Sequence, residues 1–171
     1  MRRGVLGLLL SVLCLLPARA QDASLEGHVS QWYLGPAFKL DGWAIGPHPL
    51  ETHDQLLGAQ LFHRMEPFFG TGASLYFAPR DSVFEFNLDA RWIWPLPAFE
   101  PYAGLQLSYL TRNDGGISLS FKPGLLAQVP GLPLQLDIFG LARYDVFQAL
   151  FGSQEPNQLM LGAGAVVQYK L

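Results

Sequence analysis

The sequence predicts an all-β fold: a closed, antiparallel, up-and-down transmembrane β-barrel of about eight strands, preceded by a cleaved signal peptide. Three observations predict it. Apolar and polar residues alternate over one segment after another, which is the pattern of a strand with two different faces. Turn-forming residues separate these segments at short intervals. Only 15% of the residues are charged, against about 25% in an average soluble domain, so much of the chain is expected to contact an apolar environment.

The first twenty residues have the features of a secretory signal peptide. Arg2 and Arg3 precede an apolar stretch over residues 5–16, and Ala18-Arg19-Ala20 has the small-x-small pattern of a cleavage site. The apolar stretch is shorter than the roughly 20 residues of a membrane-spanning helix. We therefore assign residues 1–20 to the signal peptide and residues 21–171 to a single barrel domain.

Cleavage makes the chain more acidic. Removing residues 1–20 lowers Lys+Arg from 11 to 8 against 14 Asp+Glu, so the formal net charge changes from −3 to −6. An acidic chain without a basic tract argues against a nucleic-acid partner. The only cysteine, Cys14, also leaves with the leader, so the mature domain has no disulfide and no cysteine metal ligand. We predict no cofactor and no metal site.

Two N-terminal segments alternate less regularly than the rest. In residues 31–41 the apolar face holds Trp32, Leu34, Phe38 and Leu40, and the opposite face holds Tyr33, Gly35, Lys39 and Asp41. In residues 55–64 the corresponding faces are Leu57, Ala59 and Leu61 against Gly58, Gln60 and Arg64. Pro36 lies inside the first segment, where a proline leaves the strand boundary open because it cannot donate to a ladder.

The clearest alternation runs over residues 83–94. Its apolar face holds Phe84, Phe86, Leu88, Ala90, Trp92 and Trp94, and its polar face holds Glu85, Asn87, Asp89 and Arg91. A helix would scatter these two sets around its circumference, whereas a strand separates them. The preceding segment, residues 69–77, shows the same period, and the turn-forming Pro79-Arg80-Asp81-Ser82 lies between the two.

Four further segments complete the count of about eight. They cover residues 100–109, 117–122, 134–145 and 159–171, with turn residues at 113–116 and at Pro130-Gly131. Pro101 and Pro123 lie at the ends of two of them. The segments approach the 9–11 residues that one strand needs to cross a bilayer.

Alternation alone permits two opposite barrels: a soluble barrel with apolar residues inside, or a membrane barrel with them outside. Small residues on the polar face favour the membrane barrel, because the interior of eight strands is only wide enough for side chains to fill. Charges of both signs on that face can form ion pairs across the interior. The predicted interior network is Glu85, Asp89, Arg91, Glu100, Lys122, Asp137, Arg143 and Asp145.

Aromatic residues also gather near the predicted strand ends, as in the interface girdles of membrane barrels. They are Trp32, Phe68, Phe69, Trp92, Trp94, Phe99, Tyr102 and Tyr169.

The C-terminal segment resembles the last strand of bacterial outer-membrane proteins, which ends on an apolar residue with an aromatic residue two positions earlier. Tyr169 and Leu171 fit, although Leu171 stands where phenylalanine is more common. Residues 100–105, Glu-Pro-Tyr-Ala-Gly-Leu, resemble a strand of the OmpA-like and opacity-protein-like barrels. The resemblance implies an eight-stranded barrel in the bacterial outer membrane, surrounded by lipid and inserted by the outer-membrane assembly machinery through its C-terminal strand.

Family topology, with both termini in the periplasm, implies short periplasmic turns at residues 64–67, 95–98 and 130–131. It places external loops at residues 42–53, 79–82, 111–116 and 147–157. The function that follows is a structural or surface-interaction role, with loops 42–53 and 147–157 as the contact for a surface partner.

Two alternatives remain at this stage. Lipid A deacylases of the outer membrane use a His and a Ser two residues apart, as in His28-Val29-Ser30, but late in the chain. A narrow, porin-like solute channel is the other alternative. His48, His53 and His63, with Glu51 and Asp54 nearby, match no standard set of metal ligands, so the sequence favours a role without catalysis.

Overall fold

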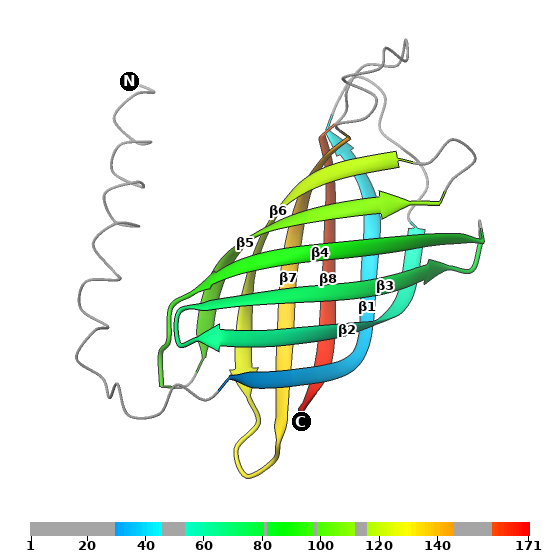
Figure 1. The fold of residues 1–171 in the computed structure, drawn as a ribbon. Helices are drawn as coiled ribbons and strands as arrows, with labels where there is room; N and C mark the ends of the chain where they lie inside the picture. The colour runs from blue at the N-terminus through cyan, green and yellow to red at the C-terminus, as the bar shows by residue number, and fades with distance from the viewer. Residues whose placement is uncertain (1–29, 46–53, 81, 98, 112–115, 146–158) are drawn as a thin grey trace, which may run out of the picture.

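The computed structural model describes residues 30–45, 54–80, 82–97, 99–111, 116–145 and 159–171. They form eight strands that close into one barrel in sequence order, with each strand antiparallel to its neighbours (Figure 1). The strands are β1 (Gln31–Ile45), β2 (Asp54–Glu66), β3 (Phe69–Ala78), β4 (Val83–Ile93), β5 (Glu100–Leu110), β6 (Gly116–Gln128), β7 (Leu134–Asp145) and β8 (Leu159–Lys170). The predicted eight-stranded antiparallel barrel is confirmed. The predicted signal peptide lies outside the described residues.

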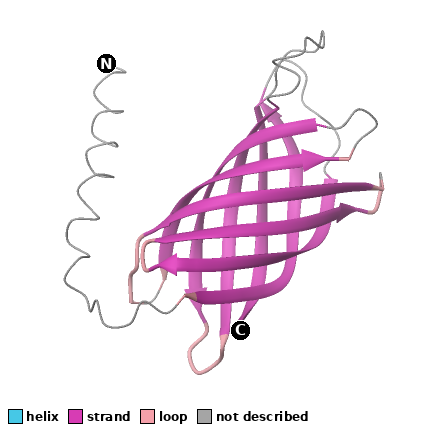
Figure 2. Cartoon of the chain, viewed as in Figure 1, coloured by secondary structure: helices cyan, strands magenta, loops and turns pink. Residues whose placement is uncertain are grey.

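The described residues consist of strands and the turns between them (Figure 2). Among them, no helix has the length and apolar character needed to cross a membrane.

Prolines lie inside β1 and β6 without ending these strands. Pro36 in β1 faces Ala59 of β2, and Pro123 in β6 faces Ala103 of β5. On the other side of each strand the proline has no paired residue: Pro36 has none on β8, and Pro123 has none on β7. Proline has no N–H to donate to a ladder. β6 therefore continues to Gln128, beyond the predicted end at residue 122.

The two ends of the barrel differ in their connections. The turns β2–β3, β4–β5 and β6–β7 lie at the end that also holds the C-terminus, which we call the turn end (Figure 1). The β3–β4 turn lies at the opposite end, which we call the loop end. Residues 42–45 belong to β1, which corrects the predicted start of the first long loop. The remainder of that loop (46–53) and loop 147–157 lie outside the described residues.

The alternation of the sequence becomes an inner and an outer wall. Along β4, every second residue from Val83 to Ile93 is buried, and most residues between them are exposed. Leu88, at the middle of the outer wall, is 63% exposed, whereas Asn87 beside it is buried. The structure thus places the polar face inward, although apolar Phe62, Leu126 and Phe139 also lie in the interior.

Large interior side chains cover glycines on the neighbouring strand. A Cβ at Gly124 of β6 would lie 2.4 Å from the ring of Tyr102 on β5, and one at Gly164 of β8 would lie 2.4 Å from the ring of Phe139 on β7. Each glycine, because it has no side chain, therefore makes room for one aromatic ring. This pairing of small with large residues is how a narrow barrel reaches a packed interior.

We expect Gly124→Val to destabilise the barrel by about 1–3 kcal/mol, the usual cost of overpacking, because Tyr102 already fills that space. Gly116→Val on the same strand is the control, since a Cβ there meets nothing within 4 Å. The measurement is equilibrium unfolding in urea with the protein in detergent micelles. Equal losses in the two variants would contradict this account of the packing.

Candidate functional site in the barrel interior

Four charged side chains form a compact group near the loop end, which we call the loop-end cluster: Lys39, Asp41, Glu85 and Arg143. The Lys39 ammonium lies 2.5 Å from Glu85 Oε1 and 3.1 Å from Asp41 Oδ2. The Arg143 guanidinium contacts the same two carboxylates, at 2.6 Å from Asp41 and 3.3 Å from Glu85. Strands β1, β4 and β7 supply these residues, so the cluster ties together three separate parts of the wall.

A second group, the turn-end cluster, consists of Asp89, Arg91, Lys122 and Asp137. Arg91 is its centre, because its guanidinium pairs with Asp89 on its own strand and with Asp137 on β7, the latter at 2.7 Å. Lys122 lies 3.5 Å from the other oxygen of Asp89. All four residues are at most 5% exposed, so each charge depends on its partners rather than on water.

Neutral groups complete the turn-end cluster. The Tyr102 hydroxyl donates to Asp137 Oδ1 at 2.7 Å, and the Gln60 amide donates to Asp137 Oδ2 at 3.4 Å. The Arg91 guanidinium lies over the ring of Phe62, 4.5 Å from its centroid, and the Lys122 ammonium lies 4.3 Å from the centroid of Phe139. Cations favour the faces of aromatic rings, so the apolar interior residues also support the charges.

Arg64 and Glu100 form a third ion pair close to the turn end. The guanidinium donates to both carboxylate oxygens, at 2.7 and 2.9 Å, and also to the carbonyl oxygen of Pro67. These two side chains are 12% and 13% exposed, so this pair is more solvated than the two clusters.

The described interior charges balance. Five cations, Lys39, Arg64, Arg91, Lys122 and Arg143, face five carboxylates, Asp41, Glu85, Asp89, Asp137 and Glu100. Within each of the three groups the numbers are also equal: two against two, two against two, and one against one. Burying a charge without a partner is costly, so local neutrality is what allows ten charges to share a narrow space.

Most of the predicted network lies in these clusters. Glu85, Asp89, Arg91, Lys122, Asp137 and Arg143 are buried in them, whereas Glu100 pairs separately with Arg64. Asp145 is the last residue of β7 and pairs with Ser118 of β6. The structure does not describe its side chain.

The sequence-predicted network omits Lys39, Asp41 and Arg64. The alternation had already placed these three residues on the polar face of their segments. A search for every charged residue on the polar faces, with charges of opposite sign matched in number, would have included these three residues.

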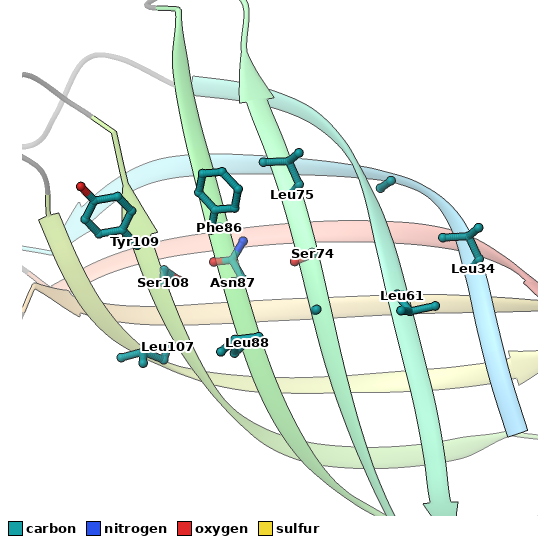
Figure 3. Close-up of a pocket in the computed structure, with 12 residues that line it drawn as sticks. Leu34, Leu61, Ser74, Leu75, Phe86, Asn87, Leu88, Leu107, Ser108 and Tyr109 are labelled. Carbon is teal, nitrogen blue, oxygen red and sulfur yellow. The ribbon is translucent and has the colours of Figure 1, made fainter. Parts of the chain in front are cut away.

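The outer wall is apolar over its middle section. Leucine and aromatic side chains of β1 to β5, together with Ala59 and Ala73, line a shallow hollow of about 500 Å³ (Figure 3). The large side chains labelled there include Leu34, Leu61, Leu75, Phe86, Leu88, Leu107 and Tyr109. A surface of this kind suits contact with acyl chains.

Exposed aromatic residues mark the outer wall at the turn end, as the sequence predicted for strand ends. Trp32, Phe68, Trp92, Phe99 and Tyr169 are all exposed there. Tyr102 is an exception, because it points inward and is only 3% exposed. Its assignment to an interface girdle was wrong, since its even position on β5 shares the face of Gln106 and Ser108.

The C-terminal signature residues complete the closure of the barrel. Tyr169 pairs with Leu34 of β1 and Leu134 of β7, with its ring on the outer wall. The Leu171 amide donates to the Trp32 carbonyl oxygen at 2.9 Å. The last residues of the chain therefore hold β8 against the start of β1.

The other residues considered for chemistry are only partly described. His28, His48, Glu51 and His53 lie outside the described residues. Within the described part of the chain, no group of three or more His, Cys, Asp or Glu side chains could hold a metal ion. Ser30 and His63 are described and contact each other.

Comparison with solved structures identifies the fold. The barrel is similar to the N-terminal β-barrel domain of OprF from Pseudomonas aeruginosa, with a TM-score of 0.55 at 12% identity over 81% of this chain and 97% of that chain. It is also similar to neisserial surface protein A, NspA, with a TM-score of 0.51 at 13% identity over 83% of this chain and 97% of that chain. The fold is that of the small outer-membrane β-barrels. No protein-family model and no curated protein matches the sequence.

The outer-membrane barrel fold expected from the C-terminal strand is thus confirmed, and at such low identity the likeness extends to the fold alone. In both comparisons, the matched region includes nearly the whole solved chain of the other protein.

We expect Arg91→Met to destabilise the barrel by about 3–5 kcal/mol, because it leaves Asp89 and Asp137 buried without their main cation. Arg64→Met is the matched control. It should cost clearly less, since Glu100 is partly exposed and can be hydrated. Urea unfolding of both variants in the same detergent measures the difference, and a ranking with Arg64→Met as the costlier change would contradict the role given to the turn-end cluster.

Proposed function

We propose that this protein is an integral protein of the bacterial outer membrane, in which a closed barrel anchors external loops for a structural or surface-interaction role. The observation that carries the proposal is the inverted polarity of the barrel. Its interior holds the paired charges, and its outer wall holds large apolar side chains such as Leu88, Leu107 and Phe121, each about half exposed or more. Water disfavours so continuous an apolar surface, whereas the hydrocarbon of a bilayer accommodates it.

The interior supports an anchor rather than a channel. Eight strands enclose a space that side chains can fill, and here two clusters cross it, one near each end. Arg143 of β7 reaches Asp41 of β1 and Glu85 of β4, while Arg91 of β4 reaches Asp137 of β7. An ion that passed through would have to separate these pairs.

The partners follow from the same arrangement. The outer wall contacts the lipid bilayer, and β8 carries the signal by which the assembly machinery recognises the chain. Residues 46–53 and 147–157 are our choice for contact with a surface partner, because loops on a rigid scaffold usually carry recognition. NspA, which shares the fold, is named as a surface protein. Neither a cofactor nor a nucleic acid has a role in this proposal.

Placement in a bilayer can be tested at the centre of the outer wall. We expect Leu88→Arg to cost about 2–4 kcal/mol in lipid vesicles, the range for an arginine at the bilayer midplane. Leu96→Arg, in the β4–β5 turn, changes an equally large exposed side chain and should cost about 0–1 kcal/mol. Urea unfolding in vesicles gives both values. Similar costs at the two positions would argue against a membrane-spanning barrel.

Conduction tests the closed interior. We expect the refolded protein to show no stable single-channel steps in planar bilayers, because the two clusters occupy the passage. Insertion must be verified in the same preparation by heat-modifiable migration on a gel. Reproducible unitary currents would favour the channel alternative instead.

A further inference from the structure

The outer wall carries a serine and a histidine in direct contact at the turn end. Ser30 precedes β1 and is exposed, and His63 lies on β2 with its ring partly accessible. Ser30 Oγ and His63 Nε2 form a hydrogen bond between residues that are 33 positions apart in the chain. The pairing of β1 with β2 brings them together, since Trp32 faces His63 across the ladder.

The histidine ring is held in place by an aromatic stack. The Trp32 indole and the His63 imidazole lie 4.0 Å apart between centroids, with only 4° between their planes. This stack fixes the plane of the imidazole and leaves Nε2 directed at the serine. In the tautomer with the ring proton on Nδ1, Nε2 can accept the serine proton.

A serine with a histidine base in hydrogen-bond contact is the arrangement that activates a hydroxyl as a nucleophile. We propose that Ser30 and His63 form an acyl-transfer site on the outer wall, acting on ester-linked acyl chains of lipids at the membrane interface. The site differs from the His28-Val29-Ser30 pair suggested by the sequence, because the base comes from another strand.

The location selects the class of substrate. Trp32, Trp92 and Tyr169 are exposed on the same end of the outer wall, and tryptophan and tyrosine mark the level of lipid headgroups. Ester groups of lipids lie next to that level, between headgroup and hydrocarbon. The choice of a lipid ester rests on the proposed membrane location, whereas the activation of Ser30 does not.

The reaction balances with water as the second substrate. Ser30 Oγ attacks the ester carbonyl carbon while its proton passes to His63 Nε2. The carbon–oxygen bond to the alcohol then breaks, and His63 returns the proton to the departing oxygen. Water next attacks the acyl-serine with His63 again accepting a proton, which releases the carboxylic acid and restores the serine hydroxyl.

The first test is labelling with an alkyl fluorophosphonate, in which an activated serine oxygen displaces fluoride from phosphorus. The protein is refolded into phosphatidylethanolamine–phosphatidylglycerol vesicles, and the modified residue is located by peptide mass spectrometry. We expect labelling at Ser30, none there in Ser30→Ala, and a rate at least about 100-fold lower in His63→Gln, which removes the base but keeps a hydrogen-bonding group. Ser82 is an exposed serine in the same chain and serves as the internal control.

Labelling that is equal at Ser30 and Ser82, or that is unchanged in His63→Gln, would overturn the proposal and leave the contact a structural hydrogen bond. Release of fatty acid from the same vesicles is the second measurement. Release that requires both Ser30 and His63 supports lipid ester hydrolysis, and labelling without release overturns that reaction. Heat-modifiable migration reports insertion independently, so a failed activity assay is distinguishable from a failed membrane location.

Discussion

The pairing of β1 with β8 is the constraint on which the rest of the structure depends. Without it the sheet has two edges, and their unpaired N–H and C=O groups have no partner in lipid. The ladder joins Tyr33 to Lys170 at one end and Ile45 to Leu159 at the other. The β1–β8 ladder contains two irregularities, a register shift between Asp41 and Trp43 and the missing N–H of Pro36. Paired residues continue on both sides of each, so the barrel stays closed.

Closure with eight strands then limits what the interior can contain. The space is narrow, so a ring such as Tyr102 or Phe139 requires a glycine beside it, and a charge requires an opposite charge within contact distance. Buried ion pairs add little net stability compared with apolar packing, whereas breaking one is costly. The clusters therefore restrict which arrangements of the strands are tolerated more than they increase the total stability. Arg91 and Arg143 connect strands on opposite sides of the barrel in this way.

Period-two alternation was sufficient to predict the number of strands and which residues of β4 to β8 share a face, because each strand has two chemically different environments. The small residues and the charges of both signs on the polar face then predicted that this face points inward. Alternation could not fix the ends of β1 and β6. β6 continues past Pro123, which is accommodated by a gap in the ladder on one side only, and β1 continues past a register shift between Asp41 and Trp43. Both depend on the neighbouring strand, which a single segment does not reveal. The pairing of charges was likewise beyond a local pattern. Arg64 and Glu100 are 36 residues apart, and only the register of β2 and β5 in a closed sheet brings them together.

The contact between Ser30 and His63 shows the same limit for chemistry. His28 and Ser30, two residues apart in the chain, suggested a site because proximity in the sequence was the available criterion. The ladder instead places Trp32 opposite His63, and the indole then holds the imidazole toward a serine two residues earlier in the chain. The inner wall uses its charged groups to pair with one another across the barrel. The outer wall has few polar groups, so a hydroxyl and an imidazole in contact at its rim are free to meet a substrate that arrives through the membrane interface.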